Sequence, residues 1–97
     1  MAKGYWISCY RSIKNPDGLA AYAKLAGPAI QAAGGKFLVR GMPAHTHEQG
    51  VNQRTVVVEW ESLAKAIAFH DGPEYQAALK ALGNAVERDF RIVEGAP

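Results

Sequence analysis

The side chains of this sequence that can do chemistry are scattered along it. Glu59 stands inside the strongly apolar segment Val56-Val57-Val58-Glu59-Trp60, where an ionised carboxylate is unfavourable unless it is paired. Such a carboxylate can act as a general base or as a hydrogen-bond acceptor for a ligand. It can equally be the structural partner of Arg40 or Arg54, and the structural reading is the commoner one for such positions.

The histidines offer two weaker candidates. The segment His45-Thr46-His47-Glu48 has the spacing of some metal ligands, but it lacks a third ligand and lies in a polar stretch. We therefore expect no metal, haem or other cofactor. His70 adjoins Asp71 and can form a pair that titrates near neutral pH, although a histidine there more often ends a helix and favours its dipole.

The single cysteine, Cys9, can form no internal disulfide and indicates a reducing compartment. Alternation groups it with Tyr5 and Ile7, which we expect to face the core, and a buried thiol is inert. The sequence contains no Ser-His-Asp motif, phosphate-binding glycine loop or dinucleotide fingerprint.

The first elements that must position these residues are a strand and a helix. The aromatic and β-branched run 5–10 predicts the strand. Asn15-Pro16-Asp17 combines a capping residue, a proline suited to the first helical turn and an acid that favours the dipole. An apolar stripe then predicts a helix with a kink near Pro28, ended by Gly34-Gly35 in a left-handed cap.

The second half of the chain alternates similarly. Residues 36–40 and 54–60 predict two strands joined by a loop over 41–53, and Ser62 caps a second helix that breaks at 71–74 and restarts to about Leu82. Residues 89–94 predict the last strand. This order predicts one α+β domain over 1–97, a ferredoxin-like βαββαβ fold with a four-stranded antiparallel sheet and the helices on one face.

Alternation within the strands predicts a partner for the other sheet face. Val56, Val58 and Trp60 share one face of their strand and Val57 lies on the other, so both faces carry apolar groups and helices can cover one. We expect a homodimer through the sheet faces.

Composition narrows the partners further. The sequence is 48% hydrophobic with a formal charge of +2 and has no apolar run of the ~20 residues that a membrane span needs. RNA-recognition modules share this fold, but the third strand offers Thr55, Val57 and Glu59, which do not stack on bases. We expect a cytoplasmic protein without nucleic-acid or membrane partners.

Several segments, taken in order, carry a family resemblance. They are Gly4-Tyr5-Trp6-Ile7, Tyr22 with Gly34-Gly35, 37–41, Arg54 with 56–60, Ser62, 72–76 and 92–95. In these segments the chain resembles domain-of-unknown-function family 1330, a branch of the dimeric α/β-barrel superfamily. The resemblance implies a ferredoxin-like protomer and a sheet-to-sheet dimer, and supplies no activity. His70 stands where an aromatic residue is expected in such proteins.

These observations predict a homodimeric protein that binds a small, partly apolar molecule in a cleft, and they leave enzymatic turnover open. The candidate ligand-binding residues are Trp6, Arg40, Glu59, His70 and Tyr75. The hypothesis places Glu59 and Arg40 at the border of one cleft, with Trp6 or Tyr75 as its apolar wall. The alternative is a non-catalytic dimerisation module with no small-molecule site.

Overall fold

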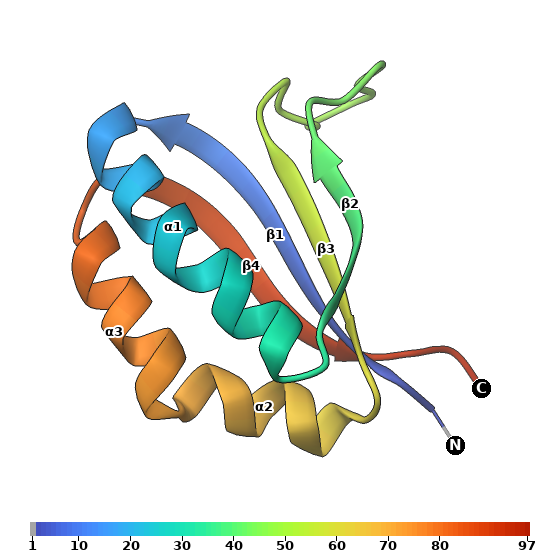
Figure 1. The fold of residues 1–97 in the computed structure, drawn as a ribbon. Helices are drawn as coiled ribbons and strands as arrows, with labels where there is room; N and C mark the ends of the chain where they lie inside the picture. Colours follow the sequence, from blue (N-terminus) through green and yellow to red (C-terminus); the bar gives the residue numbers. More distant parts are fainter. Residues whose placement is uncertain (1) are drawn as a thin grey trace.

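A four-stranded antiparallel sheet carries three helices on one of its faces (Figure 1). The computed structural model describes residues 2–97. The elements follow in the order β1 (Gly4–Ile13), α1 (Pro16–Ala32), β2 (Lys36–Gly41), β3 (Thr55–Trp60), α2 (Leu63–Asp71), α3 (Pro73–Leu82) and β4 (Val86–Glu94). The strands lie side by side in the order β2-β3-β1-β4. This arrangement confirms the ferredoxin-like prediction, although β1 and β4 are longer than expected.

The ends of the helices follow from local chemistry. The Asn15 side chain accepts hydrogen bonds from the backbone amides of Asp17 and Gly18, so it caps α1 as expected. Ser62 caps α2 in the same way through the amide of Lys65. After α1 the chain turns at Gly34, whose φ of +98° is readily adopted only by glycine. The helix itself continues without interruption through Pro28.

The two faces of the sheet differ in what covers them. We call the face toward the helices the helix face and the opposite one the open face. In β1 the residues Trp6, Ser8 and Tyr10 are buried on the helix face, whereas Cys9 is exposed. The expectation that Cys9 faces the core was therefore wrong. The error has a physical cause, because both sets of alternate residues in β1 are apolar enough to fill a core.

A bulge in β2 changes the side on which one candidate residue lies. Lys36 pairs with Glu59 and Phe37 with Val58, but the register then shifts, and Arg40 pairs with Val56. One extra residue in a strand turns every later side chain to the other face. Arg40 consequently shares the helix face with Phe37, over whose ring its guanidinium lies at 4.3 Å.

The core is aromatic and lies between the helices and the helix face. The centroid of the Trp6 ring lies 5.0 Å from that of Trp60, 4.6 Å from that of Tyr75 and 5.3 Å from that of Phe90. The Trp6 indole also donates a buried hydrogen bond to the backbone carbonyl of Ala66 in α2. Among the described residues, no helix is long and apolar enough to cross a membrane.

Candidate functional site

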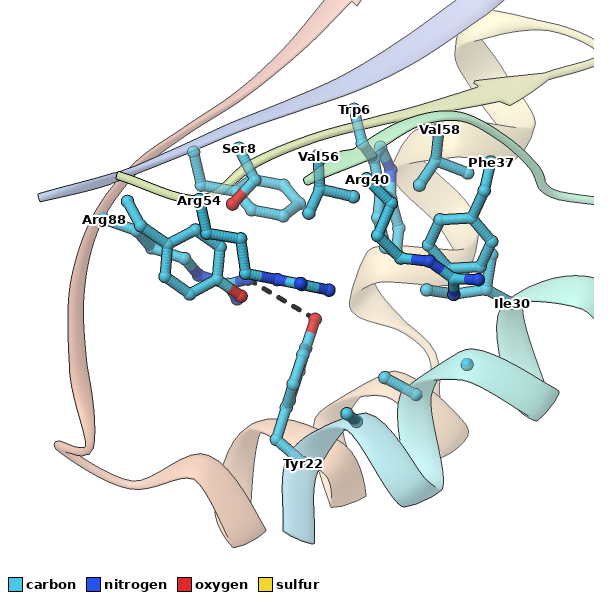
Figure 2. A pocket seen from close by; sticks show the side chains of 15 residues that line it. Trp6, Ser8, Tyr22, Ile30, Phe37, Arg40, Arg54, Val56, Val58 and Arg88 are labelled. Atoms are coloured by element: carbon cyan, nitrogen blue, oxygen red, sulfur yellow. Dashed lines mark hydrogen bonds between the residues drawn. The ribbon is translucent and has the colours of Figure 1, made fainter. Parts of the chain in front are cut away.

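A cavity lies between α1 and the helix face of the sheet, and all four strands or their ends contribute to it (Figure 2). It encloses about 60 Å³ of space that the centre of a water molecule can reach, several times what one water needs. Its walls are largely aromatic and apolar, with a smaller polar set. The lining residues are Trp6, Ser8, Tyr10, Tyr22, Ala23, Ala26, Gly27, Ile30, Phe37, Arg40, Arg54, Val56, Val58, Arg88 and Phe90.

Three arginines, Arg40, Arg54 and Arg88, give the cavity its charge. None of the three forms an ion pair with an acid in the described chain, and no Asp or Glu is among the lining residues. Figure 2 shows the side chains of Arg40 and Arg54 extending into the space between the sheet and α1. Positive charge without an acidic neighbour attracts an anion, and low-dielectric walls strengthen that attraction.

Arg88 is held by aromatic side chains. Its guanidinium donates to the hydroxyl of Tyr75 at 2.9 Å and to that of Tyr22 at 3.4 Å, and it lies 4.8 Å from the ring centre of Phe90. Burial works against its charge, but the two tyrosine oxygens outweigh this effect and raise the pKa of Arg88. The side chain is therefore a fixed cation at any physiological pH.

The two tyrosines form one hydrogen-bonded unit. Their hydroxyl oxygens are 2.6 Å apart, and both side chains are buried. Burial raises the pKa of the Tyr75 hydroxyl above its ordinary value, the neighbouring Tyr22 adds to this, and Arg88 opposes it. Tyr75 is thus a neutral phenol that must donate its proton to a neighbour.

Two polar atoms of the cavity residues are buried without a partner in the described chain, the Ser8 hydroxyl and the Arg54 Nε. The indole nitrogen of Trp60 shares this condition but belongs to the core and does not line the cavity. A buried donor without an acceptor is unfavourable by roughly 1–3 kcal/mol, and more when charged. A bound molecule that accepts from Ser8 and Arg54 removes that penalty.

The structure brings together only part of the predicted site. Trp6 and Arg40 line the cavity, and Tyr75 lies directly behind it through its bond to Tyr22. His70 is outside the cavity. Its ring is 5.2 Å from that of Tyr75, and its Nδ1 is 3.0 Å from a carboxylate oxygen of Asp71 at the end of α2.

The predicted contact between Glu59 and Arg40 is wrong. Glu59 lies on the open face, where it accepts a hydrogen bond of 3.0 Å from the Tyr5 hydroxyl and is opposite Lys36. Arg40 was turned to the helix face by the β2 bulge. The two residues therefore border no common cleft.

Sequence reasoning missed Arg54 and Arg88 as site residues. Arg54 is followed at two-residue spacing by Val56 and Val58, and Arg88 by Phe90 and Ile92. These apolar residues pack against the core, so each arginine shares their face of the strand. This pattern could have identified them from the sequence, because an arginine on the core-facing side of a strand is a buried charge that needs a partner.

The loop histidines lie outside the cavity. His45 and His47 are exposed, and they border a separate hollow together with Cys9 and Asp89. In the described part of the chain, no group of three or more His, Cys, Asp or Glu is placed to hold a metal ion.

Comparison with known proteins supports the fold. The family profile for a domain of unknown function, DUF1330, matches residues 3–96. A search of curated proteins finds no significant match.

Solved structures resemble the chain over nearly its whole length. A protein of unknown function from Rhodopseudomonas palustris is 23% identical, with a TM-score of 0.70 over 99% of this chain and 82% of that one. A dimeric ferredoxin-like protein of unknown function from Thermobifida fusca is 18% identical, with a TM-score of 0.62 over 99% and 92%. A cofactor-independent oxygenase from Streptomyces nogalater is 9% identical, with a TM-score of 0.63 over 100% and 96%. The TM-scores establish a shared fold, and at these low identities the likeness shows the fold alone.

Proposed function

The chain belongs to the DUF1330 family, and we propose that this member binds a small, partly apolar molecule in the cavity between α1 and the sheet. The observation that carries the proposal is the pair of buried, unpartnered polar atoms, the Ser8 hydroxyl and the Arg54 Nε, in a cavity with apolar walls. Apolar walls with a few convergent polar groups are typical of small-molecule sites. Trp6 and Arg40 are binding residues in this proposal, and Tyr75 is a residue that positions Tyr22.

The test narrows the cavity without touching its polar groups. Ala23 is an exposed residue of α1 that lines the cavity, so Ala23→Leu adds bulk to the cavity wall. Leucine is a good helix former, so the substitution should not disturb α1. We expect any small aromatic acid, amide or alcohol that binds the wild-type protein to bind this variant at least about tenfold more weakly, about 1.4 kcal/mol. Isothermal titration calorimetry measures the change.

The matched control is Ala21→Leu. Ala21 is also exposed in the same helix but does not line the cavity, so affinity should not change. If no compound of the panel binds the wild-type protein, or if both leucine variants bind equally well, the cavity is not a ligand site. The chain then fits the description of a dimerisation module.

We infer a second property from the open face. Leu38, Val39 and Val93 are each more than 40% exposed, and β3 presents Val57 opposite Ile7 on the same face. No helix of the described chain covers this apolar surface. A second copy of the same chain is the occupant that we propose, and the dimeric protein from Thermobifida fusca supports it as a relative of the same fold.

A further inference from the structure

We infer that the ligand of the proposed site carries an oxyanion, a carboxylate or phenolate on a flat apolar skeleton, and that the Tyr22 hydroxyl donates a hydrogen bond to it. The inference rests on the proposed function and goes beyond it by naming the class of ligand and the donor. Its basis is a count of protons in the buried unit of Tyr22, Tyr75 and Arg88.

The count begins at Tyr75. Its side chain is 0% exposed, and in the described chain its hydroxyl oxygen has two neighbours, Arg88 at 2.9 Å and Tyr22 at 2.6 Å. A guanidinium has no acceptor. The Tyr75 proton can therefore be donated only to the Tyr22 oxygen, while the Tyr75 oxygen accepts from Arg88.

The direction at Tyr75 determines the direction at Tyr22. The Tyr22 oxygen accepts from Tyr75 and, at a longer 3.4 Å, from Arg88, so its own proton has no acceptor within this unit. Tyr22 lines the cavity and Tyr75 does not. The Tyr22 O–H is thus a free donor toward the cavity, made more polar because its oxygen accepts from the two groups behind it.

The remaining groups select the charge and shape of the acceptor. The free Nε–H of Arg54 and the unpartnered hydroxyl of Ser8 add donors to the same cavity. No lining residue is acidic, so an anion meets attraction from the guanidinium groups and no repulsion from a carboxylate. The rings of Trp6 and Phe37 are flat apolar walls that suit a conjugated or aromatic skeleton.

The experiment compares an anion with its neutral isostere. Benzoate and benzamide are nearly equal in size and differ in charge, and we expect benzoate to bind the wild-type protein roughly 10- to 100-fold more tightly, the range for a hydrogen bond to a charged group. A phenolate arm uses 4-nitrophenol, whose absorption reports its ionisation. We expect binding to increase the phenolate fraction at fixed pH. Comparing the two arms shows which oxyanion the site prefers.

Two tyrosine variants test the direction of the hydrogen bonds. Tyr22→Phe removes the free donor and should reduce the preference for benzoate over benzamide at least about tenfold. Tyr75→Phe removes the hydroxyl behind it, leaves the Tyr22 donor in place, and should retain most of the preference. A purely structural tyrosine pair would affect binding equally in both variants, so equal losses would overturn the assignment.

Arginine variants keep the inference testable if Tyr22→Phe does not fold. Arg54→Gln should lose most of the benzoate preference, whereas Arg11→Gln removes the same charge at an exposed position outside the cavity and should retain it. Benzamide binding as tightly as benzoate, with a fall in the phenolate fraction of 4-nitrophenol, would overturn the inference and leave the proposed ligand site intact. Failure of all three probes to bind would overturn both.

Discussion

At the scale of single residues, the chemistry of the site depends on which groups have partners and which do not. The same side chain type behaves differently in the two environments of this chain. Tyr5 on the open face donates to Glu59, and that hydrogen bond raises its pKa. Tyr75 has no carboxylate partner, and its pKa is raised mainly by burial. The Tyr5 hydroxyl can exchange with solvent, whereas the Tyr75 hydroxyl is buried behind the cavity, next to Tyr22.

The Tyr75 environment predicts a loss of stability at alkaline pH. Because burial raises the folded-state pKa of Tyr75 above its ordinary value, the folded state binds this proton more tightly than the unfolded state does. The corresponding stability is fully present below the unfolded pKa and is lost as the pH rises above about 10. Melting temperatures across that range should fall more steeply for the wild-type protein than for Tyr75→Phe.

The control for this prediction is Tyr5→Phe. Tyr5 lies on the open face, where solvent screens its interaction with Glu59, so this variant should retain the alkaline fall of the wild-type protein. A Tyr75→Phe variant with an unchanged slope would show that Tyr75 does not contribute to it.

At the scale of elements, two local features of the backbone place the site. The β2 bulge turns Arg40 toward α1. Gly34 lies in the turn between α1 and β2, and its positive φ lets the helix end and the chain enter the strand. The bulge is a short-range feature, yet it decides that Arg40 lines the cavity.

The Gly34 backbone predicts a difference between two otherwise identical substitutions. Gly34→Ala should lower the free energy of unfolding by roughly 1–3 kcal/mol, because a φ of +98° strains a residue with a Cβ. Gly41→Ala should be neutral or stabilising by about 0.4–1 kcal/mol, since Gly41 has open space for a Cβ and no positive φ. Urea denaturation measures both. Equal effects would show that the turn does not need glycine.

At the scale of the whole molecule, the sheet separates two surfaces for which we propose different roles. The cavity lies on the helix face. The exposed apolar residues Leu38, Val39 and Val93 lie on the open face, in the edge strands β2 and β4. In the proposed dimer, each protomer therefore keeps its own cavity on the side away from the interface. Dimerisation and ligand binding should then be separable by mutation.

The open face predicts how a charge affects assembly. Val57→Lys should shift the protein toward monomer, because an unpaired charge at the centre of a sheet interface is poorly tolerated. Light scattering at low micromolar concentration should report twice the chain mass for the wild-type protein and a lower mass for the variant. Ala77→Lys, at an exposed position of α3, is the control and should leave the mass unchanged. A monomeric wild-type protein would contradict the proposed interface.

The sequence by itself determined the element order and therefore the fold. Caps at Asn15 and Ser62, the Gly34 turn and period-two strands are local signals that need no knowledge of distant contacts. The alternation of residues within the strands also predicted that both sheet faces are apolar. Its consequence, a covering partner, remains a prediction that the Val57→Lys experiment tests.

Only the tertiary structure decided which face is which and which residues share the site. In β1 both alternate sets are apolar, so alternation could not say whether Trp6 or Cys9 is buried. The hypothesis that Arg40 and Glu59 border one cleft depended on the register of two strands, and the bulge before Arg40 places Arg40 opposite Val56, on the face away from Glu59. The unit of Tyr22, Tyr75 and Arg88 joins three elements that lie 13 to 66 residues apart in sequence. Its hydrogen bonds form only once α1 and α3 have packed over β4. Local sequence patterns could not predict them, because such patterns do not specify contacts between residues far apart in the chain.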